Sequence, residues 1–229
     1  MKFTDSAVTG FRANVASVNE LARFDRLILE IAIDGLEKVA DSLLNEHRLY
    51  NASRIPHNRA LALRNVHQTD SLKRHYDVMF NQCVVLLVSY FGSAMHDLFR
   101  DTVKQALIQG HDVPATRAEI KISWSVLGAG ADGADVFAEQ LVEQGQISFQ
   151  DMQSIVRAFN THFGIALQRT SATNDIILGQ AARHAIVHNM ALVDTRMLKQ
   201  IQAAIPRTLK SQLTPNETRL HARGDCGSR

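Results

Sequence analysis

The chain has 229 residues, of which 45% are hydrophobic and 21% are charged, so it is long enough to bury a sizeable core and has an ordinary globular composition. Its formal net charge is only +2, which excludes a polycation that binds nucleic acid through its overall charge. Such a partner would need a local basic patch. Only four prolines occur, which favours long helices over an all-β fold. The two cysteines fit a reducing compartment better than a disulfide framework.

Neither a targeting segment nor a membrane span is predicted. The N-terminus lacks the apolar stretch of a signal peptide. The most apolar run, residues 84–95, is about 12 residues long, whereas a transmembrane helix needs about 20. We therefore interpret this run as part of a buried core helix and expect a cytoplasmic protein without a membrane segment.

Two long helices are predicted in the first half of the chain. Apolar residues recur at helical spacing over 17–49. Residues 50–70 are interpreted as a connection, because Pro56 is a helix breaker. The next helix is predicted over 70–109 and ends at Gly110. It is apolar on more than one side, which indicates a course through the core.

Shorter elements follow. Apolar and polar residues alternate near 119–127, which predicts a short extended segment. Helices are then predicted over about 134–143 and from Asp151 to Phe163, where Gly164 ends the helix. The last two are predicted over 173–190, with Thr173 or Asn174 as its cap, and from a cap at Asp194 onward.

These elements predict an all-α fold, an antiparallel helical bundle with at most one short extended segment. Residues 1–69 are either a separate lobe or the first helix of the same bundle. No stretch before residue 50 resembles a linker, which favours the same bundle, so a single domain is predicted over residues 1–206. Residues 207–229 are polar and are predicted to be a mobile tail.

Basic side chains are concentrated between residues 48 and 75, a segment that contains six Lys or Arg residues and one acidic residue. The segment is either a solvated surface loop, as most charge runs are, or a patch that contacts phosphate. The second interpretation makes RNA-binding candidates of Arg54, Arg59, Arg64, Lys73 and Arg74.

The residues with the clearest chemical potential are Arg183 and His188, near the end of a predicted helix. Five positions correspond to about 140° of rotation on a helix, so the two side chains do not point the same way. His184 and His188, four positions apart, share one face. Two copies of this helix around a two-fold axis would bring both arginines and both histidines into one cleft.

This arrangement resembles the motif of the HEPN superfamily, an arginine followed by a polar residue and, after four to six residues, a histidine. The tetrapeptide at residues 186–189 and the earlier aromatic helix around Tyr90 and Phe99 are similar to the corresponding segments of the RiboL-PSP-HEPN and MAE_28990-type branches. The resemblance covers roughly residues 70–205. Gly92 stands where those branches often carry an acidic residue, which leaves the branch open.

The resemblance implies a homodimeric, metal-independent endoribonuclease that needs no cofactor and acts on RNA. Arg183 would bind the phosphate and its transition state, and His188 would act as general acid and base, with His184 and Asn189 as supporting residues. An antitoxin or another defence protein is an expected partner. The alternative is a non-catalytic HEPN module that binds nucleotide or RNA, or mediates assembly.

Two rival motifs carry less weight. Gly128, Gly130 and Gly133 match G-x-G-x-x-G, but the sequence beyond them predicts helices and not the second strand of a dinucleotide site, so a loop is expected. His96 and Asp97 lack further ligands at metal-binding spacing, and no metal site is expected.

Overall fold

The computed structural model describes residues 5–68, 73–123, 132–168, 170–195 and 197–199. Apart from an isolated bridge residue at Leu192, the regular elements of these residues are helices, so the predicted all-α class is confirmed. Contacts divide the chain into two compact units, Met1–Val15 with Val84–Leu220 and Ala16–Cys83 with His221–Arg229. The predicted boundary at 206 and the tail 207–229 lie outside the described residues, and the single domain 1–206 stays a prediction.

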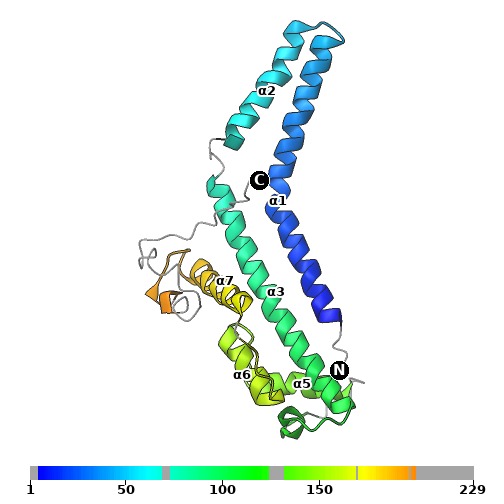
Figure 1. The fold of residues 1–229 in the computed structure, drawn as a ribbon, viewed down its shortest axis with the longest axis vertical. Coiled ribbons are helices and arrows are strands. Elements are labelled where there is room, and N and C mark those ends of the chain that lie inside the picture. Colours follow the sequence, from blue (N-terminus) through cyan, green and yellow to red (C-terminus); the bar gives the residue numbers. More distant parts are fainter. Residues whose placement is uncertain (1–4, 69–72, 124–131, 169, 196, 200–229) are drawn as a thin grey trace. The chain divides into compact units, whose positions relative to one another are not determined.

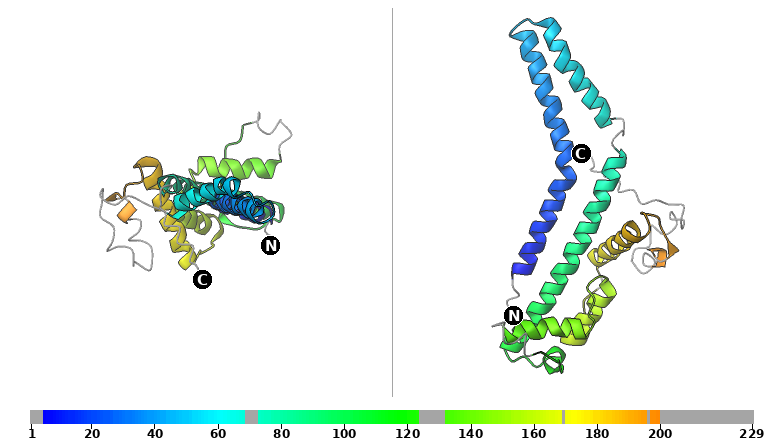
Figure 2. Two further views of the ribbon diagram at one scale, coloured as in Figure 1. Left: turned by 90° about the horizontal axis from the view of Figure 1, so that it is seen from above. Right: turned by 180° about the vertical axis from the view of Figure 1, so that it is seen from behind.

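The Ala16–Cys83 unit is built on a helical hairpin. Helix α1 (Asp5–Asn45) is followed after a short turn by α2 (Tyr50–Gln68), as Figures 1 and 2 show. Arg64 of α2 pairs with Glu37 of α1 at 2.7 Å, which ties the two helices together. The guanidinium of Arg26 lies 5.8 Å from the ring centre of Tyr76, within the reach of a cation–π contact. Among the described residues of this unit, the buried apolar side chains are Val18, Ile33, Ala40, Pro56, Ala60 and Cys83.

The interpretation of residues 50–70 as a connection is wrong, because α2 occupies residues 50–68 and contains Pro56 in its second turn. Residues 69 and 70 lie outside the described part of the chain. A proline there removes one backbone donor and costs about 3 kcal/mol in a helix interior. The Ala and Leu residues at 60–63 have high helix propensity, and Pro56 itself is buried. Burial and propensity therefore outweigh the local cost, which a rule based on proline alone does not register.

Helix α1 also begins earlier than the predicted residue 17. Val8, Phe11 and Val15 continue the helical spacing of apolar residues toward the N-terminus. Phe11 contacts Phe91 edge to face, with ring centroids 6.1 Å apart. This tertiary contact stabilises a turn whose local sequence, with Thr9 and Gly10, is a weak helix former.

The other unit is centred on Phe99 of α3 (Lys73–Ile108), a helix predicted with nearly these bounds. Phe99 is fully buried. Its ring lies 5.5 Å from that of Phe149, 5.7 Å from that of Phe159 and 5.1 Å from that of Phe163. Since Phe159 and Phe163 belong to α6 (Met152–Phe163), this cluster fixes α6 against α3.

Charged groups hold α5 (Gly133–Gln144) against α3. The Lys104 ammonium pairs with Asp135 at 2.7 Å and with Asp132 at 2.9 Å. The two carboxylates raise the pKa of Lys104, Asp135 contributing most. Asp132 also accepts a hydrogen bond from the first turn of α5 and so caps it. The short 3-10 helix η1 (Pro114–Arg117) contacts α6.

The predicted extended segment is only partly described. Residues 118–123 form neither helix nor strand, and residues 124–127 of the predicted segment lie outside the described part of the chain. Gly128 and Gly130 of the glycine motif lie outside it as well, whereas Gly133 begins α5.

Helix α3 is long and apolar enough to cross a membrane by length and composition alone. The stretch His75–Ile108 has a mean hydropathy of 1.5 in its most apolar window, of which 11% is buried. The burial expected for the run 84–95 is not found, because its residues other than Gly92 are half-buried or exposed. The buried part of α3 lies farther along, at Phe99 and Val103. One such helix is weak evidence for a span, and the absence of a membrane segment stays a prediction.

Gly164 ends α6 as predicted, in the left-handed region with φ of 68°. We expect Gly164→Ala to lower the free energy of unfolding by about 1–2 kcal/mol, because a Cβ atom is strained there. Gly10→Ala is the matched control, since that helical glycine has no atom within 4 Å of an added Cβ, and it should raise stability by about 0.5–1 kcal/mol. Urea titration of both variants measures this, and equal shifts would contradict it.

His162 should make stability depend on pH. Burial lowers the pKa of His162, whose ring lies 5.5 Å from that of Phe99. The unfolded chain protonates it near its ordinary pKa of about 6.5, so unfolding takes up a proton below that pH and the free energy of unfolding falls. We expect His162→Phe to lose less stability than the wild type between about pH 7 and about pH 5, as urea midpoints would measure. An unchanged pH dependence would contradict the assignment.

Candidate functional site

Helix α7 (Ser171–His188) carries the predicted Arg–His motif. Its cap is Thr170, whose hydroxyl accepts a hydrogen bond from the Thr173 N–H at 3.3 Å. The predicted caps Thr173 and Asn174 are instead buried residues of the first turn. Thr173 nevertheless takes part in capping, because Thr170 and Thr173 form a reciprocal capping box. The predicted start of the helix is therefore only a few residues too late.

Two contacts position α7 on the rest of its unit. The Gln180 side-chain oxygen accepts a hydrogen bond of 2.9 Å from the Met152 N–H, at the start of α6. A Cβ atom on Gly179 would lie 3.3 Å from Val88 of α3, so the helices approach closely there. After the helix the chain folds back, and Ala181, Ala185, Val193 and Met197 form a small buried cluster. The C-terminal half of α7 is thus held from two sides.

Arg183 is half-buried, and its Nε atom is buried without a hydrogen-bond partner among the residues that the structure describes. A buried donor without a partner costs about 1–3 kcal/mol, more when the group is charged. Such a group calls for an explanation. The side-chain nitrogen of Gln180 on the same helix is likewise buried without a partner in the described part of the chain. An anion would meet the terminal nitrogens of the Arg183 guanidinium, since Nε itself is closed to solvent.

The two histidines of the motif share one face of α7, as predicted. The ring centroids of His184 and His188 lie 4.9 Å apart, with 44° between the ring planes. His184 is half-buried, whereas His188, the last residue of the helix, is exposed. An imidazole at this position can exchange protons with a bound substrate.

Asn189 closes the turn that follows His188. Its backbone N–H donates to the Ala185 carbonyl at 2.9 Å, and its side-chain amide donates to the Leu192 carbonyl at 2.9 Å. Met190 and Ala191 adopt positive φ values of 49° and 62°, a strained backbone that such bonds stabilise. Asn189 therefore fixes the chain beside His188.

The RNA-binding candidates are far from the Arg–His motif in the sequence and belong to the Ala16–Cys83 unit, whereas α7 belongs to the other unit. Arg54 and Arg59 are exposed on α2, which has no acidic residue. Arg64 is partly neutralised by Glu37. Lys73 and Arg74 begin α3, and their side chains lie outside the described residues. The basic segment is thus a helix and not the loop that the sequence suggested.

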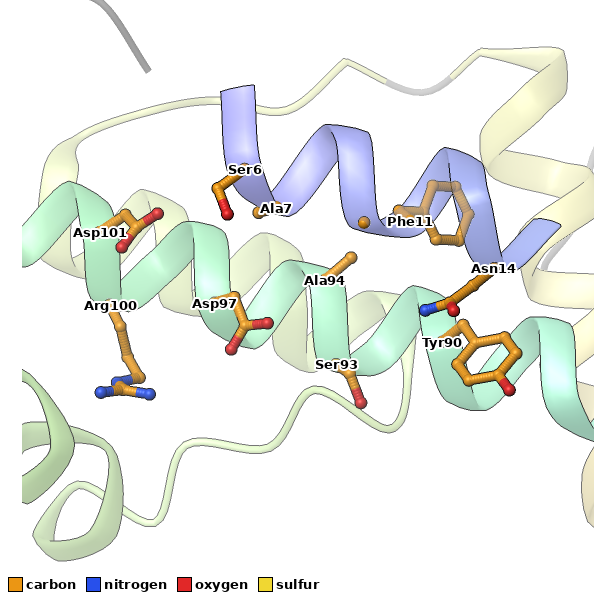
Figure 3. A pocket seen from close by; sticks show the side chains of 11 residues that line it. Ser6, Ala7, Phe11, Asn14, Tyr90, Ser93, Ala94, Asp97, Arg100 and Asp101 are labelled. Atoms are coloured by element: carbon orange, nitrogen blue, oxygen red, sulfur yellow. The ribbon is translucent and has the colours of Figure 1, made fainter. Parts of the chain in front are cut away.

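A hollow of about 360 Å³ opens between the first turns of α1 and the second half of α3, and the sequence did not indicate it (Figure 3). Phe11 and Asn14 reach it from α1, and Asp97 and Asp101 from α3. Arg100 points away from α1 in Figure 3, and it pairs with Glu139 at 2.8 Å. The carboxylates make this hollow unsuitable for phosphate. Its complete lining is Ser6, Ala7, Gly10, Phe11, Asn14, Tyr90, Ser93, Ala94, Asp97, Arg100 and Asp101.

Within the described part of the chain, no group of three or more His, Cys, Asp or Glu side chains could hold a metal ion. His96, one of the residues considered for such a site, contacts the Phe149 ring at 5.4 Å and lies 3.5 Å from Asp97. It contributes to packing beside the Phe99 cluster.

Comparison of the chain with protein-family models, with curated proteins and with solved structures gives no match.

Asn189→Ala should lower the free energy of unfolding by about 0.5–1.5 kcal/mol, because it removes the hydrogen bond to the Leu192 carbonyl. Asn58→Ala, at an exposed position of α2, is the matched control and should stay within about 0.5 kcal/mol of the wild type. Chemical denaturation compares the two. If both variants matched the wild type, the side chain of Asn189 would not stabilise the turn.

Proposed function

We propose that this protein is a metal-independent endoribonuclease whose site combines Arg183 and His188 at a homodimer interface. The observation that carries the proposal is the end of α7, where an exposed histidine follows an arginine whose buried Nε lacks a partner among the described residues. The all-α class and the likeness of the motif to the HEPN superfamily agree with it.

A second copy is part of the proposal because of helix geometry. Arg183 and His188 are separated by about 140° around α7, so one helix cannot present both to the same phosphate. A two-fold axis beside α7 supplies the arginine of one copy and the histidine of the other. His188 is exposed and therefore available for such an interface.

The reaction needs no external nucleophile. His188 accepts the proton of the RNA 2′-hydroxyl, and the 2′-oxygen attacks the adjacent phosphorus. Arg183 binds the non-bridging oxygens as negative charge develops on them. The bond from phosphorus to the 5′-oxygen breaks, and that oxygen takes a proton from an imidazolium. The products are a 2′,3′-cyclic phosphate and a 5′-hydroxyl.

Arg54, Arg59 and Arg64 are proposed contacts to the RNA backbone, because a helix without acidic residues, such as α2, attracts phosphate. Lys73 and Arg74, at the start of α3, are proposed as further contacts. Unregulated RNA cleavage harms the host cell. We therefore place the enzyme in a toxin–antitoxin or phage-defence system of the cytoplasm, with a control protein as partner.

The second candidate function is a non-catalytic HEPN module that binds nucleotide or RNA, or mediates assembly. The orphaned donor of Arg183 favours it as much as it favours catalysis, since either role brings a phosphate to the guanidinium. The ribonuclease and the binding module differ only in whether His188 transfers protons.

The test is to incubate the purified protein with total RNA in excess EDTA. We expect cleavage by the wild type and a loss of about 10²–10⁴-fold in His188→Ala, the range of general acid–base catalysis. His67→Ala is the matched control, because His67 is an exposed histidine in the last turn of another helix. It should cleave like the wild type.

A mixture of Arg183→Ala and His188→Ala tests the shared site. Mixed dimers regain one complete site if each site takes its arginine and histidine from different copies, so activity should return in part. No cleavage by folded wild-type protein on any RNA would support the binding module instead. Equal cleavage by all variants would refute the assigned residues.

A further inference from the structure

A line of apolar side chains on α1 lies open to solvent. Leu21, Phe24, Ile28, Ile31 and Val39 are between 45% and 58% exposed. Their spacing of three and four residues, continued by Gly35, places them along one face of the helix, over a length of about 27 Å. We call these six residues the α1 stripe; all of them belong to the Ala16–Cys83 unit.

The α1 stripe is not the face with which α1 packs inside its own unit. That inner face carries the buried Val18, Ile33 and Ala40. Together the two faces form an apolar arc of about 200°, twice the width of an ordinary amphipathic stripe. Helices that are apolar on two sides are buried between two neighbours. The stripe therefore indicates a second neighbour.

The charges beside the α1 stripe identify this neighbour. Glu20 and Lys38 are exposed and about five whole turns apart, so they lie on the same edge of the stripe at its two ends. Arg23 and Asp34 lie on the same side, also exposed and in the opposite order of charge. Glu30 and Asp41 are also exposed on this side. When the helix is reversed, Glu20 meets Lys38 and Arg23 meets Asp34, whereas Glu30 and Asp41 meet no opposite charge.

We infer that the α1 stripe binds the same stripe of a second copy of this chain, with the two helices antiparallel. A two-fold axis level with Leu29 sets Glu20 opposite the partner's Lys38, and Arg23 opposite the partner's Asp34, twice each. It also sets Phe24 opposite the partner's Gly35. Nothing lies within 4 Å of a Cβ atom placed on Gly35, so the glycine leaves room for an aromatic ring.

The apolar area limits the affinity. Burying a large aliphatic or aromatic side chain fully removes on the order of 100 Å² from water, and the exposed stripe residues are about half exposed. The interface is thus at the small end of specific interfaces. We expect a dimer that dissociates on dilution. This inference does not depend on the proposed ribonuclease activity.

Sedimentation equilibrium of the full-length protein tests it, from about 1 µM to about 1 mM. We expect one reversible association step through the stripe in the wild type, from monomer to dimer or, where the proposed α7 interface also forms, from dimer to tetramer. Phe24→Glu should weaken that step at least about 30-fold, as for a central interface residue. Ile55→Glu is the matched control, since Ile55 of α2 is 68% exposed and outside the stripe. It should leave the dimerisation constant unchanged, and circular dichroism confirms that each variant is folded.

Charge reversal tests the antiparallel register. Glu20→Lys should weaken the dimer about 2- to 30-fold, because each surface pair contributes about 0.2–1 kcal/mol and occurs twice. Lys38→Glu should do the same, and the double variant should recover the wild-type constant. In a Cys226→Ser background, a mixture of Glu20→Cys and Lys38→Cys should form an intermolecular disulfide, and neither variant alone should.

Three results would overturn the inference. The wild type could show no such association step at any concentration. The step could be equally strong in Phe24→Glu, which would locate the interface elsewhere. Glu20→Cys alone could cross-link to itself, which would indicate parallel helices. Loss of dimerisation with unchanged RNA cleavage would refute only a link between this interface and the enzyme site.

Discussion

The packing of the unit that contains Val84–Leu220 depends on the buried ring of Phe99. Its ring lies within 6 Å of the rings of Phe149, Phe159, His162 and Phe163. Such edge-to-face contacts contribute beyond the area they bury. They attach α6 to α3, and the first turn of α6 in turn donates a hydrogen bond to Gln180 of α7. The position of the Arg–His motif on α7 therefore follows from an aromatic cluster that contains no residue of the motif.

The end of α7 has a firmly held backbone and a buried hydrogen-bond donor without an acceptor in the described part of the chain. The turn closed by Asn189 and the cluster of Ala181, Ala185, Val193 and Met197 hold the backbone. The buried Nε of Arg183, in contrast, lacks an acceptor among the described residues. A fold tolerates this cost where a ligand offsets it. The acidic hollow beside Asp97 and Asp101 offers no such site for an anion.

Each of the two units has a surface feature for which we proposed a second copy of the chain. On α7, an arginine and a histidine point in different directions, and the proposed chemistry needs both. On α1, an apolar arc is too wide for one neighbour, and Glu20 and Lys38 at the two ends of its edge have opposite charges. The two proposals place a second copy of the chain at two different surfaces.

The sequence by itself determined the all-α class, the bounds of α3, α5 and α6, and the shared face of His184 and His188, because periodicity and caps such as Asp151 and Gly164 are local signals. It failed at residues 50–70, where burial of Pro56 outweighs a local rule, and at the start of α1, which Phe91 stabilises. Only the tertiary structure decided that the Arg183 Nε is buried without an acceptor among the described residues and that the α1 stripe is exposed. Periodicity tells which residues share a face, whereas burial depends on what the remote parts of the chain place against that face.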